Sequence, residues 1–468
     1  MNKTILIVGC GMSQIPTFNA AKTLGVNTVG VDFNPDACAV KMADIFEQCD
    51  IKNEKGVLAI ARKHKVDGIV VPGTDFPVTG AYVSEQMGFP TTPLKVAKLC
   101  SSKIKQKEFL RREGFLVPES YEITDTADLY HLEFPLVLKP DDNMAARGTK
   151  KLYYTSNAYN EINDARSFSR TEKVLAEKFE EGMELSVDSL VYDGEVFVFA
   201  VADRHFALDP YLIEVGHTMP SVLNQEIQRE VITIFTNAVK ALGITYGSAK
   251  GDLKISDKGI MILEIANRIS GGVLSGWTVP MATGVFPHED LIRIHLGEKP
   301  FFRKATTKLF SAERNFLSIP GTLKQIQRFN MNSASANFVH FHAEVGDDLR
   351  FPYNNANRVG SAVAIGVTGA GARRTAQDVV NDTLFRLEPN NDITEEWIHG
   401  LDKDFQMFYT IKKENDWYGI DFAEALEKVF IATERKYSDI KNDEGFWKYF
   451  YKGGIQGGAY YIDTYIND

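Results

Sequence analysis

The first 90 residues constrain the fold most strongly, because short apolar runs there alternate with helical stretches. The alternating segments are residues 4–9, 18–24, 27–32, 56–64 and 67–73. This alternation is typical of a parallel sheet whose strands are joined by crossover helices. The sequence therefore predicts an α/β domain with a Rossmann-like parallel sheet at the N-terminus.

Composition limits the classes of function open to the chain. Apolar residues make up 44% of the 468 residues and the formal net charge is -10, so the chain can bury a core but lacks a broadly basic face for nucleic acid. The four cysteines have no metal-binding spacing, and no apolar run reaches the length of a membrane span. We expect a cytoplasmic enzyme that binds neither nucleic acid nor membrane; a homodimer is left open.

The turn after the first strand is also compatible with a different class of function. Gly9 and Gly11 lie between the first strand and its helix, and Asp32 ends the second strand, as in dinucleotide-binding proteins. Gln14 stands where the fingerprint requires its third glycine. An NAD(P)-dependent oxidoreductase is therefore kept as an alternative.

Residues 247–272 carry the most informative pattern. Two alternating strands flank Asp257, Lys258 and Gly259, and a three-residue turn with a left-handed glycine would place Asp252 opposite Glu264. Facing carboxylates repel each other unless something holds them together, and such a pair attracts a divalent cation. Asn267 adds a third oxygen. This oxygen set suits Mg²⁺ or Mn²⁺, although two exposed acids on an edge hairpin would give the same pattern.

Other charged residues upstream extend this set. Lys139 ends an apolar strand before a loop that contains Arg147 and Gly148, which suits an ammonium group and backbone N–H groups placed over phosphates. Glu177 and Glu184 lie across the bend between two further strands, where carboxylates can accept hydrogen bonds from adenine and ribose. Each of these charges alone would be typical of a solvated surface.

Together these motifs resemble the ATP-grasp superfamily, and more narrowly its carboxylate–amine ligases, which include L-amino-acid ligases and relatives of biotin carboxylase and carbamoyl phosphate synthase. The motifs are Lys103 eleven residues before Gly114, the FPLVLKP strand with its glycine loop, the AEKFEEGMELSVD segment, and DLK followed by LEIANR. The loop DDNMAARGT has fewer glycines than usual in the family, and Asp252 replaces the more frequent glutamate.

The resemblance covers residues 1–395 and implies a fold of mixed α/β and α+β class. The implied domains are a Rossmann-like pre-ATP-grasp domain at 1–92, an ATP-grasp domain at 93–305 with a small lid at about 135–190, and a biotin carboxylase-like domain at 306–395. Residues 396–468 are an aromatic-rich extension of unknown role, outside the resemblance. Within the third domain, the pattern predicts a strand at 361–369 and a helix at 376–387.

The resemblance also implies roles for individual residues. Lys103 and Lys139 would contact the phosphates of ATP, with Arg147 and Gly148 over them, whereas Glu177 and the Lys178 and Phe179 backbone would meet adenine and Glu184 the ribose. Asp252, Glu264 and Asn267 would hold one or two Mg²⁺ ions.

The implied reaction activates a small carboxylic acid, such as an amino acid, as an acyl phosphate and couples it to an amine, with release of ADP and phosphate. Arg268 would stabilise the acyl phosphate and the oxyanion that follows it. Arg204, Glu214 and His217 would contact the substrates, with His205 a weaker candidate. A carboxylase that uses bicarbonate is the alternative within the same fold.

Overall fold

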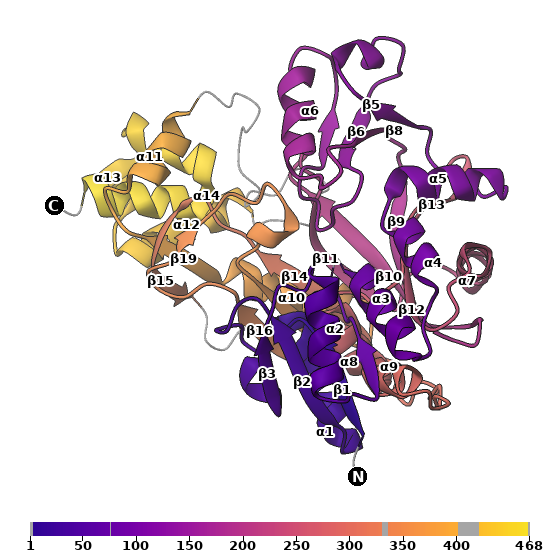
Figure 1. Cartoon of the computed structure of the whole chain (residues 1–468). Helices are drawn as coiled ribbons and strands as arrows, with labels where there is room; N and C mark the ends of the chain where they lie inside the picture. The colour runs from indigo at the N-terminus through magenta and orange to yellow at the C-terminus, as the bar shows by residue number, and fades with distance from the viewer. Residues whose placement is uncertain (1–2, 75, 330–335, 401–420, 467–468) are drawn as a thin grey trace. The chain divides into compact units, whose positions relative to one another are not determined.

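Two compact units make up the computed structural model, which describes residues 3–74, 76–329, 336–400 and 421–466. The first unit comprises Met1–Met144, Gly148–Arg204 and His217–Ser311. The second comprises Ala145–Arg147, His205–Gly216 and Ala312–Asp468. Each unit is described below by itself, with the elements labelled as in Figure 1.

A parallel sheet opens the first unit (Figure 1, indigo). Its strands, in the order β3-β2-β1-β4, are β3 (Ile45–Gln48), β2 (Asn27–Asp32), β1 (Thr4–Val8) and β4 (Gly68–Val70). The helices between and after them are α1 (Ile15–Leu24), α2 (Glu54–Lys63) and α3 (Pro77–Met87). Residues 5–8 of the central strand are completely buried. The predicted Rossmann-like sheet is confirmed, because its strands pair in parallel and helices connect or follow them.

The glycine turn after β1 is filled by the chain's own groups. The Gln14 side chain accepts a hydrogen bond from the Gly11 N–H at 2.9 Å and donates to the Pro72 carbonyl at 2.5 Å. Asp32 accepts from the backbone N–H groups of Cys10 at 2.7 Å and Asn34 at 2.9 Å. A dinucleotide would need these same donors and this carboxylate, so the geometry disfavours the oxidoreductase alternative.

A small antiparallel sheet follows in the chain. Its order is β5-β8-β6-β7, with β5 (Ser120–Ile123), β8 (Val174–Lys178), β6 (Leu136–Pro140) and β7 (Lys150–Leu152). Helix α6 (Ala158–Ser167) packs on it through Ala158, Ile162 and Ala165, which share a core with Leu136 and Leu138. This sheet carries Lys139 and Glu177 on neighbouring strands.

A larger antiparallel sheet completes the first unit. Its strands there run β13-β12-β9-β10, with β13 (Gly259–Ala266), β12 (Gly247–Ser256), β9 (Met183–Tyr192) and β10 (Glu195–Ala207), and β13 is the edge strand. Helix α7 (Gln225–Leu242) covers it with Val231, Phe235 and Leu242, and Gly243 ends this helix at a φ of 82°. Apolar residues at helical spacing followed by Gly243 predict this helix and its end, and the structure confirms both.

Four shorter helices surround these sheets in the first unit. They are α4 (Leu94–Cys100), α5 (Lys103–Arg112), α8 (Val279–Thr283) and α9 (Pro287–His295). Helix α5 begins at Ser102, whose hydroxyl accepts from the Lys105 N–H. Within the described ranges, no helix is both long and apolar enough to cross a bilayer.

The second unit contains strands from two sheets and a group of helices. Its strands include β14 (Phe310–Phe316), β18 (Gly360–Gly366) and β16 (Phe338–Phe341), together with β17 (Asp348–Leu349), β15 (Gly321–Arg328) and β19 (Thr383–Leu387), and β11 (Ile213–Met219) crosses the division between the units. Its helices are α10 (Gly369–Asn381), α11 (Asp392–His399), α12 (Phe422–Thr433), α13 (Tyr437–Ile440) and α14 (Glu444–Tyr465).

One predicted element of the second unit is wrong. Residues 376–387 were expected to form one helix, but α10 ends at Asn381 and residues 383–387 form strand β19. Residues 383–387 form a strand because Phe385 pairs with Ile326 of β15 and buries its ring in the core. Parallel and antiparallel sheets with covering helices confirm the predicted mixed fold class, whereas the four domain boundaries stay predictions.

Candidate functional site

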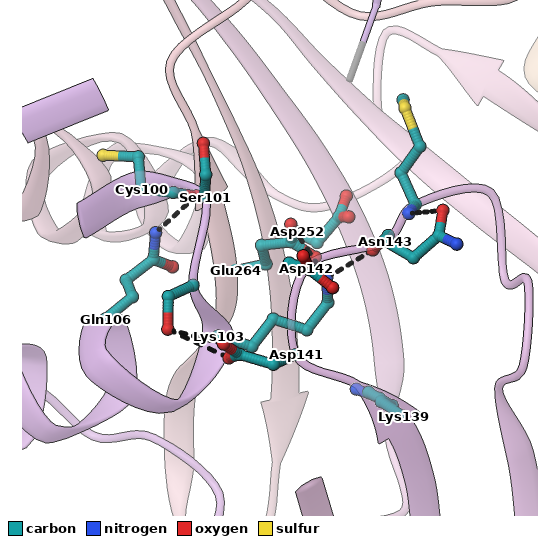
Figure 2. Close-up of polar contacts among 12 residues, drawn as sticks. Cys100, Ser101, Lys103, Gln106, Lys139, Asp141, Asp142, Asn143, Asp252 and Glu264 are labelled. Atoms are coloured by element: carbon teal, nitrogen blue, oxygen red, sulfur yellow. Dashed lines mark hydrogen bonds and ion pairs between the residues drawn. The ribbon is translucent and has the colours of Figure 1, made fainter. Parts of the chain in front are cut away.

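The β12–β13 hairpin brings the two predicted metal ligands together. Asp252 pairs directly with Glu264, as predicted, and Figure 2 shows the two side chains next to each other. Their side chains are 16% and 30% exposed, so both carboxylates remain accessible from solution. Side chains at paired positions lie on the same face of a sheet, which makes the pair suitable for holding a cation.

The register of this hairpin corrects the predicted turn. Ser256 pairs with Gly259, so the turn has two residues rather than three, and Gly259 has a φ of +118°. The register then shifts between Asp252 and Leu253, because Leu263 is an extra residue on β13. A two-residue turn followed by a bulge places Asp252 opposite Glu264, just as a three-residue turn without a bulge would.

Arg204 connects two other predicted site residues. Its guanidinium group lies 3.0 Å from the Asp252 carboxylate and 3.5 Å from the Glu184 carboxylate. Lys250 also pairs with Asp252, and Lys254 lies 3.0 Å from Glu184. The residues predicted for metal, ribose and substrate therefore form one network across strands β9, β10 and β12.

Lys103 lies close to Glu264 of the carboxylate pair (Figure 2). Its ammonium group is 3.7 Å from Glu264 and donates to the Asn143 carbonyl at 2.5 Å. Asp141 fixes the start of α5, because it accepts from the Ser102 hydroxyl and from the Ile104 N–H at 2.9 Å. Lys103 is therefore held beside the pair by a capped helix terminus.

A buried cluster of two lysines and one glutamate lies beside the small sheet. Glu177 is 3% exposed, and its carboxylate lies 2.6 Å from Lys139 and 3.0 Å from Lys107. Burial raises the pKa of Glu177, but Lys107 and Lys139 outweigh it and hold this pKa at about 2. Burial also lowers the pKa of Lys107, and Glu177 partly opposes that effect. Glu177 therefore stays ionised at neutral pH.

The segment after Glu177 contains the residues predicted to meet adenine. The Lys178 and Phe179 N–H groups each donate to a backbone carbonyl at 2.9 Å, those of Glu119 and Pro135. The Phe179 ring lies under the Lys151 ammonium group at 3.7 Å from the ring centre. These backbone donors are engaged within the chain, so their role toward adenine stays a prediction.

Arg268 and Asn267 lie in the first unit, after β13. Arg268 donates to the Ile269 carbonyl at 3.2 Å, and the Asn267 amide donates to the Ser248 carbonyl at 3.1 Å. Both residues line a small cavity of about 30 Å³ together with Thr92. The structure thus keeps them next to the hairpin, and their predicted roles stay predictions.

The remaining predicted residues are divided between the units. Gly148 and His217 lie in the first unit, where Gly148 has a φ of +65° and His217 is 3% exposed and bonds to the Thr278 hydroxyl at 2.8 Å. Arg147 and Glu214 fall in the second unit. There the Glu214 N–H donates to Asn355 at 3.0 Å.

The sequence reasoning missed several charged residues of the site. These are Lys107, Lys250 and Lys254. Lys107 lies four residues after Lys103, so both point from the same side of α5, and this spacing was a signal available in the sequence.

The donor set fits a divalent cation bound through oxygen. Asp252 and Glu264 supply hard carboxylate oxygens, and Asn267 follows on the same strand and loop. Asp252 and Glu264 pair across the hairpin, and within the described ranges no group of three His, Cys, Asp or Glu residues could hold a metal ion. A pair of this kind is suited to Mg²⁺ that is also bound by phosphate oxygens.

Comparisons with known sequences identify the first unit's central part. The family model of the ATP-grasp domain matches residues 100–272. Carnosine synthase 1 of Mus musculus is 23% identical over 315 residues, which are 60% of this chain and 38% of the relative. Alanine–anticapsin ligase of Bacillus subtilis (strain 168) is 21% identical over 242 residues, 46% of this chain and 51% of the relative. The chain thus spans about half or less of these relatives.

Solved structures with the same fold include known ligases and carboxylases. An L-amino acid ligase from Bacillus licheniformis has a TM-score of 0.70 and 19% identity, over 83% of this chain and 99% of that one. Biotin carboxylase from Campylobacter jejuni has a TM-score of 0.63 and 16% identity, over 82% and 92%. At these identities the similarity shows a shared fold, and the family model confirms the predicted ATP-grasp domain. Residues 100–272 therefore form an ATP-grasp domain, as the sequence predicts, and the matched relatives include carboxylate–amine ligases.

Proposed function

We propose that this protein is an ATP-dependent ligase that activates a small carboxylic acid as an acyl phosphate and couples it to an amine, releasing ADP and phosphate. The observation that carries the proposal is the Asp252–Glu264 pair, which lies with Lys103 and Arg204 inside the ATP-grasp domain. Accessible paired acids surrounded by cations suit a metal–triphosphate complex better than either ion alone.

In this proposal the charged residues divide the nucleotide between them. Lys103 and Lys139 bind phosphate oxygens, Glu184 binds the ribose, and Asp252, Glu264 and Asn267 hold Mg²⁺ or Mn²⁺. The bound metal would neutralise charge on the transferring phosphoryl group. Arg204 would orient Asp252 and Glu184, since it already bridges their carboxylates.

Acyl phosphate formation explains why a ligase needs this arrangement. A carboxylate is a poor acyl donor, because its negative charge repels an incoming amine, whereas phosphate is a good leaving group. Arg268 would stabilise the negative charge that develops on the acyl group. At an effective dielectric constant of about 20, opposite charges about 4 Å apart attract by about 4 kcal/mol, which corresponds to roughly a thousandfold in rate.

The substrate class proposed is an amino acid joined to an amine. Support comes from the named relatives, an alanine–anticapsin ligase and an L-amino acid ligase. Arg204, Glu214 and His217 are the proposed substrate residues. The fold shared with a biotin carboxylase keeps bicarbonate as the alternative acid.

The test measures ADP release from MgATP by the purified full chain, with amino acids supplied singly and in pairs. We expect ADP release to require an acid, and hydroxylamine in place of the amine to trap the acyl phosphate as a hydroxamate. Bicarbonate as the acid that stimulates release, with no hydroxamate, would favour the carboxylase. Equal ADP release with and without every acid and amine would contradict ligase activity.

A further inference from the structure

Two consecutive side chains of α5 bind the open edge of strand β13. The Gln106 amide accepts from the Ile265 N–H at 2.8 Å and donates to the Ile265 carbonyl at 2.6 Å, as a neighbouring strand would. The buried Lys107 ammonium donates to the Leu263 carbonyl at 2.7 Å. Because Leu263 is the extra residue of the bulge, these bonds hold the backbone on both sides of Glu264.

Lys107 has a second partner, the Glu177 carboxylate, which it shares with Lys139. Two ammonium groups therefore face one carboxylate, and the cluster has one net positive charge. The side chains differ in access, since Lys107 is 2% exposed and Lys139 is 19% exposed. Lys139 is thus the lysine of the cluster that can reach a ligand.

A buried carboxylate is costly to leave without a cation. If Lys139 alone neutralised Glu177, binding a phosphate through Lys139 would leave Glu177 buried and unpaired. With Lys107 in place, Glu177 keeps an ion pair when Lys139 turns away. Lys107 therefore lowers the energetic cost of moving Lys139 from Glu177 to a phosphate.

We propose that Lys107 is a positioning residue whose charge neutralises Glu177, so that Lys139 is released to bind the nucleotide's phosphates. This inference rests on the proposed function, because it assumes that a nucleotide triphosphate binds beside Lys139. Lys107 acts through Glu177, Lys139 and the β13 backbone and touches no substrate itself.

The proposal predicts an effect on the phosphates that exceeds any effect on the nucleoside. The quantity to measure is the triphosphate preference, defined as the Kd of adenosine divided by the Kd of MgATP, by isothermal titration calorimetry. In Lys107→Met, we expect this preference to fall at least about tenfold, because Lys139 then stays on Glu177. The Kd of adenosine should change less than about threefold, because adenosine has no charge for Lys139 to bind.

Lys428→Met is the matched control, since Lys428 is another buried, ion-paired lysine and lies in the second unit. It should leave the triphosphate preference unchanged. A Lys107→Met protein that is folded, judged by its circular dichroism, and keeps the wild-type preference would overturn the role of Lys107. A wild-type protein that binds no MgATP would instead overturn the proposed function, and the inference with it.

The double variant Lys107→Met/Glu177→Gln decides the matter if Lys107→Met fails to fold. Without the Glu177 charge, Lys139 needs no substitute cation, so the triphosphate preference should return to within about threefold of wild type. A preference that stays about tenfold lower in the double variant would show that the charge of Lys107 acts on phosphate directly, which contradicts the proposal.

Discussion

Two buried lysines, one in each unit, have opposite surroundings. Lys107 in the first unit shares the single carboxylate of Glu177 with Lys139, so that three charged groups sum to +1. Lys428 in the second unit lies on two carboxylates, 2.7 Å from Asp382 and 3.0 Å from Glu424, which sum with it to -1. Burial alone therefore does not tell what a lysine does.

The two clusters differ in their net charge and in whether a lysine of the cluster is accessible. An excess positive charge with one accessible lysine can attract a polyanion, whereas a lysine on two acids has its charge fully used within the fold. The first arrangement suits binding and the second suits structure. Variants of the Lys107 cluster should therefore change nucleotide turnover and affinity. Variants of the Lys428 cluster should change stability.

Replacing Glu264 by alanine tests the binding side of this comparison with the largest expected effect. Removing one of two facing carboxylates deprives the cation of a ligand, so ADP release should fall at least about a thousandfold. Asp257→Ala is the control, because Asp257 is an exposed acid in the turn of the same hairpin. Equal activity of Glu264→Ala and wild type would remove the basis for a metal at this pair.

Lys139→Met should weaken MgATP binding about a hundredfold by calorimetry, since it removes a phosphate ligand at the accessible end of the cluster. Its thermal stability should stay close to that of wild type, because Lys107 still neutralises Glu177. A large loss of stability with unchanged affinity would reverse the assignment and make this cluster structural.

Local signals in the sequence predicted many elements of the fold. Gly243 ends α7 because a left-handed residue there costs glycine nothing, and the alternation of the first 90 residues predicted the parallel sheet. Residues 383–387 show the limit of such signals. An apolar run of this length fits a helix or a strand, and pairing with β15, a distant segment, decides it.

The candidate site was predictable where chemistry is local to one motif. The pairing of Asp252 with Glu264 was predicted correctly but from the wrong turn, since the bulge at Leu263 depends on contacts from α5 that the hairpin sequence does not contain. Lys107 was missed for the same reason. In a lysine-rich helix it reads as a surface charge, and only its distant partner Glu177 distinguishes it.

Lys428→Met tests the structural side of the comparison. The substitution leaves the mostly buried Asp382 carboxylate without this lysine, so the free energy of unfolding should fall by about 3 kcal/mol. The Kd of MgATP should stay at the wild-type value. Denaturant unfolding and calorimetry on the same preparation check both expectations, and weaker nucleotide binding at full stability would contradict them.

The smallest predicted effect concerns the way in which the stability of the first unit depends on pH. The pKa of Glu177, held at about 2, lies below its unfolded value, so its contribution to stability is lost only as pH falls below the ordinary range of glutamate. Between about pH 7 and pH 5 the first unit should instead respond through its buried histidines His288 and His295, of which His288 is tested here. Burial lowers the pKa of His288 to about 4, and its ring bonds to the Thr17 and Ser275 hydroxyls.

The unfolded chain binds a proton on His288 near pH 6.5 and the folded chain only near pH 4, so stability is complete above the first value and declines as pH falls between the two. The expected loss from about pH 7 to pH 5 is about 2 kcal/mol for this residue. His288→Gln should lower stability at neutral pH but flatten its dependence on pH, measured by denaturant unfolding at both values. An unchanged slope in this variant would assign the acid sensitivity to other groups, with His295, whose pKa burial also lowers to about 4, then the first to examine.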